Sequence, residues 1–289
     1  MSGLKKKKHQ HVLIIGNGFD LDLGLPTKYS DFINSSYFSE LCLKDNILAN
    51  HLREVHDVKN WIDVEEELKS YSKKTIHSNI FLQEYKELCA SLLSYIKSIK
   101  YDSLNIESTA YKLISILLNK DVLIIDFNYT STLQELLKIF VNEPTTEQQN
   151  IEHIKIHGGI VENNIIFGVE DSADIKKEHI FIKKSANKIF KPINFSYTLE
   201  SCDQLIVFGH SLGETDHMYF KDYFNNATTY RSTPRVGLEK QNIVLFHYDE
   251  ENYYKLLSEL DTLTYRNLKK LKEINIFEMI EVKKQKDYC

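Results

Sequence analysis

Glycine and proline are distributed very unevenly along this chain, and their distribution limits what it can fold into. All ten glycines lie in the first 24 residues or from Gly158 onward, and no proline occurs from Thr27 to Glu143. These two residue types most often interrupt regular structure. The long stretch that lacks both therefore predicts a set of helices, which we place at about residues 36–120.

Local composition supports helices in this stretch. Residues 61–68, 81–99 and 109–118 are rich in Leu, Glu, Lys and Tyr. Leu88, Leu92, Leu93 and Ile96 recur at the spacing that places side chains on one face of an α-helix. We therefore expect an amphipathic helix over residues 81–99.

Short apolar runs outside this stretch predict strands. They are His11–Ile15, Val122–Asp126, His153–Ile156, Leu205–Phe208 and Ile243–His247. Several are apolar at almost every position, as in parallel strands covered on both faces. Helix patterns follow two of them, which is typical of βαβ units. We predict a single α/β domain over residues 11–289, with a parallel-sheet, Rossmann-like core and the helical insertion at about 36–120.

Composition excludes several other classes of protein. The net charge of −5 argues against a large nucleic-acid platform, and we expect no sequence-specific nucleic-acid partner. No run approaches the roughly 20 apolar residues of a membrane span. The lysine-rich residues 1–10 predict a disordered basic tail. Because the four cysteines lack paired spacing and the histidines lack zinc-ligand spacing, we predict a cytoplasmic protein with reduced thiols and no metal site.

Polar and glycine residues follow four of the predicted strands. These segments are residues 16–20 (GNGFD), 127–130 (FNYT), 157–159 (HGG) and 209–211 (GHS). In open parallel sheets, ligands bind at the carboxyl ends of the strands and beside the helix N-termini that follow. The four segments together therefore predict one ligand site.

The first of these loops is only part of a known nucleotide fingerprint. G-x-G-x-x-G would need glycine where Leu21 stands, and no P-loop motif occurs. An ordinary strand-to-helix turn and a nucleotide-binding loop both remain open for Gly16–Gly18 taken alone.

The same segments carry a family resemblance. Residues 14–20 (IIGNGFD), 24–27 (GLPT) and 29–32 (YSDF) resemble the opening of the AbiH family of bacterial phage abortive infection proteins. Residues 61–65 (WIDVE), 127–130 (FNYT), 156–158 (IHG) and 209–216 (GHSLGETD) resemble later segments of that family in the same order. The resemblance spans residues 12 to about 250 and implies a role in antiviral defence.

A more distant similarity is to the sirtuin-like NAD-binding fold. The matching positions are the Gly16–Gly18 loop, the Gly24–Pro26 turn, Asn128, His157 and the Gly209–Ser211 loop. The arginine expected after the proline turn is missing, with Lys28 the nearest cation, and the four-cysteine zinc module is absent. The similarity implies NAD cleavage rather than protein deacetylation.

This similarity implies roles for particular residues. Asn128 would position the ribose and a water molecule, and His157 would act as general base. The residues expected to bind the nucleotide are Gly16, Asn17, Gly18, Asp20, Pro26, Gly209, Ser211 and Asp216, with Glu65, Tyr129 and His210 as further pocket residues. The similarity thus implies an NAD glycohydrolase whose substrate is NAD or a related nucleotide. We expect no prosthetic group.

Simpler roles remain open for the same residues. Asn128 could cap the following helix, His157 could be a structural strand-end histidine, and Asp20 and Asp216 could be helix N-caps. Ser211 in residues 209–213 (GHSLG) fits the nucleophile elbow of an α/β-hydrolase esterase. A non-catalytic NAD or ADP-ribose sensor is a third class. The inserted helices are candidates for a homo-oligomer contact or for sensing a phage-derived trigger.

Overall fold

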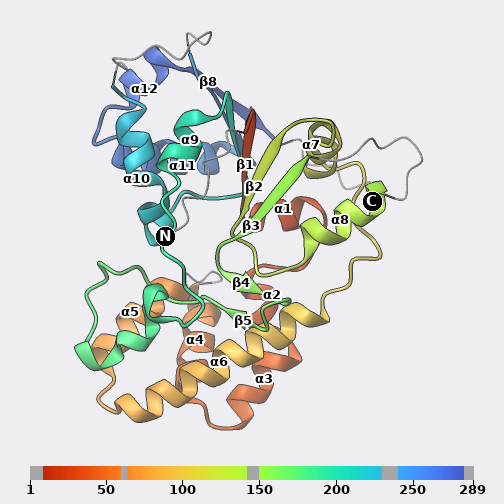
Figure 1. The fold of residues 1–289 in the computed structure, drawn as a ribbon. Coiled ribbons are helices and arrows are strands. Elements are labelled where there is room, and N and C mark those ends of the chain that lie inside the picture. The colour runs from red at the N-terminus through yellow and green to blue at the C-terminus, as the bar shows by residue number, and fades with distance from the viewer. Residues whose placement is uncertain (1–8, 60–63, 142–149, 230–239, 283–289) are drawn as a thin grey trace, which may run out of the picture.

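Six parallel strands form the central sheet of the computed structural model (Figure 1). The structure describes residues 9–59, 64–141, 150–229 and 240–282. The sheet order is β3-β2-β1-β6-β7-β8, which is the Rossmann-like order of a doubly wound sheet. Its strands are β1 (His11–Ile15), β2 (Val122–Asp126), β3 (Ile151–Lys155), β6 (Gln204–Phe208), β7 (Asn242–His247) and β8 (Ile276–Glu281). The predicted α/β parallel-sheet fold is confirmed.

Helices cover both faces of this sheet. Their bounds are α1 (Asn17–Asp22), α2 (Tyr29–Ile33), α3 (Ser36–Leu43), α4 (Ile47–Lys59), α5 (Val64–Lys74), α6 (Ser78–Ser98), α7 (Thr109–Leu117), α8 (Thr132–Val141), α9 (Ser196–Ser201), α10 (His217–Asn226), α11 (Glu250–Leu263) and α12 (Leu268–Ile274). Three short 3₁₀ segments, η1 (Lys177–Ile182), η2 (Lys184–Ala186) and η3 (Glu214–Asp216), and a hairpin of β4 (Gly158–Gly159) and β5 (Asn164–Ile165) complete the description.

The two faces of the sheet belong to two separate hydrophobic cores. On β1, Leu13 and Ile15 point into the core that includes α1, α7 and α8. Val12 and Ile14 point into the core that includes α9, α10 and α11. Successive side chains of a strand alternate between faces, so a strand covered on both sides must be apolar throughout. This is why β1 and β2 were recognisable as uninterrupted apolar runs.

Helices α3 to α6 of the glycine-free stretch form the lower helical part of Figure 1, whereas α7 lies beside the sheet and contacts α1. Helix α6 packs against α3 and α4, and its buried face includes Leu88, Leu92 and Ile96. The apolar spacing found in the sequence therefore marks the face that is removed from water. Of the predicted helix over residues 61–68, Val64 onward belongs to α5, and residues 61–63 lie outside the described residues.

Several predicted boundaries differ from the structure. Strand β3 begins at Ile151, two residues before the predicted start, because its mixed sequence lacks a clear apolar run. Strand β8 was not predicted, since it is an edge strand whose exposed Ile276, Glu278 and Ile280 alternate with Phe277 and Met279 on the covered face. Polar and apolar residues mix in this way where only one face of a strand is covered.

The end of the predicted basic tail is part of the folded structure. His9 is buried, and its Nδ1 lies 3.0 Å from Asp121 Oδ1. The carbonyl of Gln10 accepts hydrogen bonds from the backbone N–H groups of Asp203 and Gln204. Residues 9 and 10 of the predicted tail therefore contact the folded part of the protein, and residues 1–8 lie outside the described part of the chain.

Candidate functional site

A cavity of about 710 Å³ lies where the strand order of the sheet reverses. Strands β2 and β3 lie on one side of β1, and β6, β7 and β8 lie on the other. Its wall includes Gly16, Asn17 and Asp20 after β1, Asn128, Tyr129 and Thr130 after β2, His157 after β3, and Gly209, His210, Ser211 and Asp216 after β6. This is the position where open α/β sheets bind ligands, and the volume suits a small molecule.

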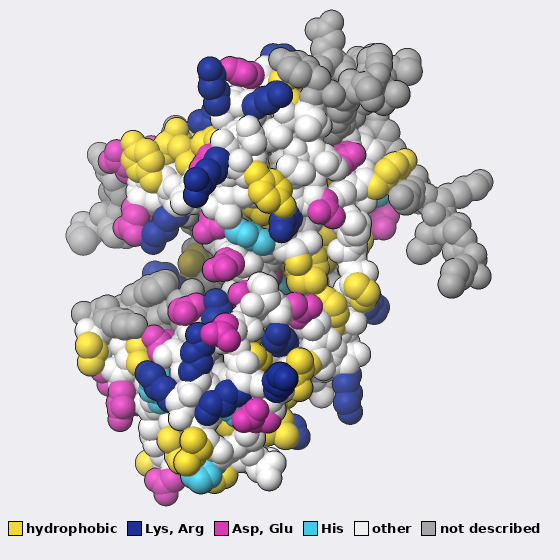
Figure 2. Space-filling view, turned by 90° about the vertical axis from the view of Figure 1, so that its left-hand side faces the viewer, with side chains coloured by type: hydrophobic (Ala, Val, Ile, Leu, Met, Phe, Trp, Pro, Cys, Tyr) yellow, Lys and Arg dark blue, Asp and Glu magenta, His cyan; other side chains and the backbone are white. Residues whose placement is uncertain are grey.

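The helical insertion supplies the opposite wall of this cavity. Glu65, Glu66 and Lys69 of α5 and Tyr95 of α6 line it, together with the Thr27–Tyr29 segment. Figure 2 shows a face of the molecule that is hollowed between the sheet part above and the insertion below, with acidic and basic side chains gathered around the hollow. The cavity is therefore formed between two parts of the chain that are distant in sequence.

The glycines of the first loop serve close backbone packing. A Cβ at Gly18 would lie 2.6 Å from the Gly209 Cα, and one at Gly16 would lie 2.8 Å from the Gly209 carbonyl oxygen. The Gly18 N–H donates to that oxygen at 2.8 Å, and Gly209 itself has a φ of +66°. Gly16 and Gly209 still line the cavity, but Gly18 and Pro26 do not. Gly18 and Pro26 were predicted to contact the nucleotide, but neither residue lines the cavity.

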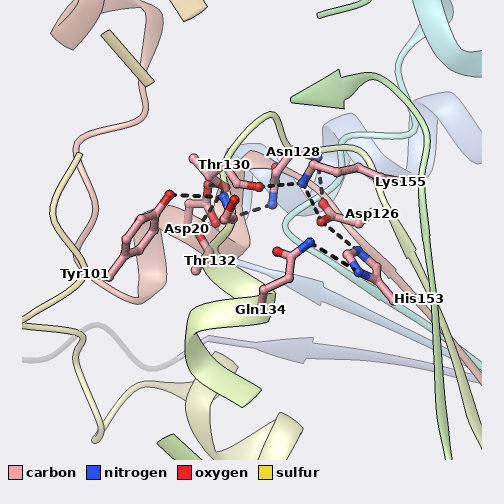
Figure 3. Close-up of polar contacts among 10 residues, drawn as sticks. Asp20, Tyr101, Asp126, Asn128, Thr130, Thr132, Gln134, His153 and Lys155 are labelled. Atoms are coloured by element: carbon pink, nitrogen blue, oxygen red, sulfur yellow. Dashed lines mark hydrogen bonds and ion pairs between the residues drawn. The ribbon is translucent and has the colours of Figure 1, made fainter. Parts of the chain in front are cut away.

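Asn128 belongs to a network of amide, hydroxyl and carboxyl groups (Figure 3). Its Nδ2 donates to Asp20 Oδ1 at 3.4 Å, and Thr130 Oγ1 donates to Asp20 Oδ2 at 2.7 Å. Thr132 Oγ1 in turn donates to Thr130 Oγ1 at 2.9 Å. The Asn128 amide is thus held by Asp20 at the cavity wall rather than by the N-terminus of α8. We call Asp20, Asn128, Thr130 and Thr132 the amide network.

Asp20 has a different role from the helix cap that we considered. Helix α1 begins at Asn17, after Gly16, so Asp20 is its fourth residue and is 1% exposed. Burial raises the pKa of Asp20 from its ordinary value to about 7, against the hydrogen bonds from Thr130 and Thr132 that lower it. The cavity therefore contains a carboxyl group that changes charge near neutral pH.

Behind the amide network, β2 and β3 are joined by a buried ion pair. Asp126 Oδ2 lies 2.9 Å from Lys155 Nζ and 3.1 Å from His153 Nε2. Burial alone would raise the pKa of Asp126, but Lys155 and His153 outweigh it and lower that pKa. The other oxygen, Oδ1, accepts the backbone N–H of Asn128 at 2.8 Å. This cluster fixes the backbone from which Asn128 projects. The residues predicted for the site from the sequence include neither Lys155 nor His153.

His157 belongs to a second, charged network. Asp216 Oδ1 lies 2.9 Å from Lys184 Nζ and 3.2 Å from His157 Nε2, and Asp216 Oδ2 lies 3.4 Å from His210 Nε2. Lys184 Nζ also lies 3.3 Å from Glu65 Oε1. His157 Nε2 has the distance of a hydrogen bond to Asp216 but not its alignment. We call Glu65, His157, Lys184, His210 and Asp216 the charged network.

The charged network fixes the protonation of its members. Burial alone would raise the pKa of Asp216, but Lys184 and His157 hold it well below its usual range. Burial lowers the pKa of His157, Lys184 adds to that effect, and Asp216 opposes it. His210 Nδ1 accepts the backbone N–H of Leu212 at 2.9 Å, so its proton is on Nε2, facing Asp216. The site thus presents a carboxylate beside a His157 whose neutral form is favoured.

Asp216 occupies the N-cap position of α10 without capping it. No side-chain hydrogen bond joins its carboxylate to that helix N-terminus. The prediction that Asp216, His157 and His210 share one site agrees with their positions, and Glu65 and Tyr129 also line the cavity. Lys184 was missed because it follows another lysine in an irregular segment, where nothing in the sequence distinguishes it from a solvated charge.

The contacts of Ser211 differ from those of a nucleophile elbow. The positive φ angles in this loop belong to Gly209 and Leu212, and the Ser211 hydroxyl accepts the backbone N–H of Gly213 at 3.2 Å. Of the two histidines that follow it, His217 pairs with Glu259, and His247 Nδ1 contacts the Asp249 carbonyl. Neither histidine is in the hydrogen-bonded position that a serine triad requires.

Two features are absent from the described part of the chain. Among its residues, no group of three or more His, Cys, Asp or Glu side chains is arranged to hold a metal ion. No helix in that part is long and apolar enough to cross a membrane.

Comparison with known proteins gives the family of this chain. The family model described as "Bacteriophage abortive infection AbiH" matches residues 12–236, which include all four strand-end segments of the cavity. No curated protein and no solved structure matches the chain. The family match covers most of the sequence, and the chain therefore belongs to the AbiH family of bacteriophage abortive infection proteins.

Proposed function

We propose that this AbiH protein binds NAD or a related nucleotide in the cavity and hydrolyses its nicotinamide–ribose bond. The observation that carries this proposal is that Asn128 and His157 both line one cavity at the switch point of the sheet. The distant sirtuin-like pattern of the same strand-end segments supports NAD as the nucleotide. We place the activity in the cytoplasm of an infected cell, where loss of NAD would stop phage production.

The reaction needs few groups from the protein. The bond between the nicotinamide nitrogen and the ribose carbon breaks, and its electron pair neutralises the cationic ring, so no general acid is needed. A water oxygen then bonds to the ribose carbon and gives up a proton. We assign orientation of the ribose and the water to the Asn128 amide, and acceptance of the proton to His157, whose lowered pKa favours the neutral form.

A comparison of nucleotides tests this function directly. The full chain is incubated separately with NAD, NADP and ATP, and nicotinamide and ADP-ribose are measured by chromatography. Nicotinamide release from NAD or NADP, absent in the Asn128→Ala/His157→Ala double variant, supports the proposal. Tight nucleotide binding without turnover, even with phage components present, would contradict hydrolysis and favour a sensor.

A further inference from the structure

Lys184 is a buried cation that the roles assigned so far do not use. It is 1% exposed, although lysine side chains are almost never fully buried unless paired. Its Nζ lies 2.9 Å from Asp216 Oδ1, 3.3 Å from Glu65 Oε1 and 3.4 Å from the Thr215 carbonyl oxygen. An ammonium has three N–H donors, and these three acceptors match them in number. A substrate phosphate would have to displace one of them.

The partners of Lys184 come from opposite walls of the cavity. Glu65 is in α5 of the helical insertion, whereas Asp216 follows β6 at the end of the sheet. Lys184 itself begins η2, and its backbone N–H donates to the Val169 carbonyl at 2.9 Å. One buried charge therefore connects three segments that are distant in sequence.

We propose that Lys184 is a positioning residue for this site: it holds the Asp216 carboxylate against His157 and, through Glu65, fastens the helical insertion to the strand ends. Lys184 Nζ contacts Asp216 Oδ1, and His210 Nε2 contacts Asp216 Oδ2. Both oxygens of the Asp216 carboxylate therefore have a partner that holds the group beside His157. This inference rests on the proposed function only for its catalytic consequence, because the positioning itself can be measured without substrate.

The charges around His157 determine in which direction each substitution should move the pKa of His157. The titratable groups near its ring are Asp216, Lys184, His210, Tyr129 and Tyr219, with Glu65 behind Lys184. Removing the Lys184 charge takes away a cation that opposes a positive charge on His157, which stabilises the imidazolium form of His157. Removing the Glu65 charge instead leaves less negative charge beside the Lys184 ammonium group. The net positive charge near His157 then increases, which disfavours the imidazolium form of His157. The two substitutions should therefore move the His157 pKa in opposite directions.

Histidine NMR titration of the full-length protein tests this inference. The His157 resonance is assigned by its loss in His157→Gln, and its pKa is compared in the unmodified protein, Lys184→Met, Glu65→Gln and the control Lys112→Met, an exposed lysine of α7. We expect Lys184→Met to raise the His157 pKa by about one unit, Glu65→Gln to lower it by less, and Lys112→Met to leave it unchanged.

The His157 pKa distinguishes a positioning role of Lys184 from a loss of folded structure. It also distinguishes that role from failure of the proposed NAD hydrolysis. If Lys184→Met does not fold, as judged by circular dichroism, the shift in Glu65→Gln decides the question. An unchanged His157 pKa in the folded variants would overturn the inference, whether or not NAD is hydrolysed. If NAD is hydrolysed, the acid limb of the pH–rate profile should move with the His157 pKa, whereas general destabilisation would lower the rate without moving that limb.

Discussion

The two polar networks that line the cavity are built from different parts of the chain. The amide network joins Asp20 after β1 to residues that directly follow β2, and its hydrogen bonds run through amide and hydroxyl groups. The charged network joins α5, the segment after β3, η2 and η3 through buried charged groups and imidazole rings. The first is confined to α1, the loop after β2 and the start of α8, whereas the second also depends on how the insertion is placed.

This difference has a physical consequence for stability. Breaking a buried ion pair leaves an uncompensated charge, which costs more than losing one hydrogen bond to a hydroxyl group. The charged network should therefore be the more sensitive of the two to substitution. The amide network should instead be the more sensitive to pH near neutrality, because Asp20 titrates there.

The largest expected effect on stability is that of Lys184→Met. This substitution removes the ammonium group that contacts both the Asp216 and the Glu65 carboxylate, and it should lower the free energy of unfolding by about 3–5 kcal/mol. Urea unfolding measures it, with Lys112→Met as the control. A loss below about 1 kcal/mol would mean that the charged network contributes no more than an exposed ion pair.

The pH dependence of stability should separate the two networks. The Asp20 pKa is raised in the folded protein, so its contribution to stability is fully present below its ordinary value and is lost as pH rises through about 7. Asp216 has the opposite sign: its contribution is present above the ordinary value and is lost as pH falls through its lowered pKa. In Asp20→Asn, stability should fall less from pH 5 to pH 8, by about 2 kcal/mol relative to the unmodified protein.

Urea unfolding at several pH values measures this difference. Asp102→Asn, at an exposed aspartate in the loop before α7, is the control and should unfold with the pH profile of the unmodified protein. Parallel profiles for Asp20→Asn and the unmodified protein would contradict a raised Asp20 pKa.

The smallest expected effect is that of Ser211→Ala. Ser211 lines the cavity, but its hydroxyl only accepts a backbone N–H in the described contacts. NAD turnover should change by no more than about tenfold, since a single neutral hydrogen bond contributes roughly 0.5–1.5 kcal/mol. Stoichiometric labelling of Ser211 by a fluorophosphonate probe would instead favour the esterase.

The sequence was informative where one local rule controlled the structure. Strands β1 and β2 are apolar on both faces, and both were predicted with their observed bounds. The strand-end segments could be grouped because parallel strands bring their carboxyl ends to one edge. The sequence therefore predicts that Asn128, His157, Gly209 and Asp216 share a site, and all four line the cavity.

Other parts of the site depend on contacts that no local pattern records. Lys184 and Glu65 meet only after the insertion is placed against the sheet. The family resemblance marked Glu65 as a pocket residue, but nothing near Lys184 in the sequence distinguishes that lysine. Asp20 and Asp216 each had a local explanation as helix caps, which their burial and tertiary partners overrode. Strand β8 was not predicted, because an edge strand needs only one apolar face and its sequence therefore lacks a continuous apolar run.

The most direct test of the central claim measures NAD binding and turnover in Asn128→Ala and His157→Ala. The matched controls are Asn79→Ala and His77→Ala, at exposed positions at the start of α6. If both side chains act on one bound nucleotide, each site variant should lose about 100-fold or more in nicotinamide release while still binding NAD, and the controls should keep full activity. Full turnover in both site variants would contradict the claim.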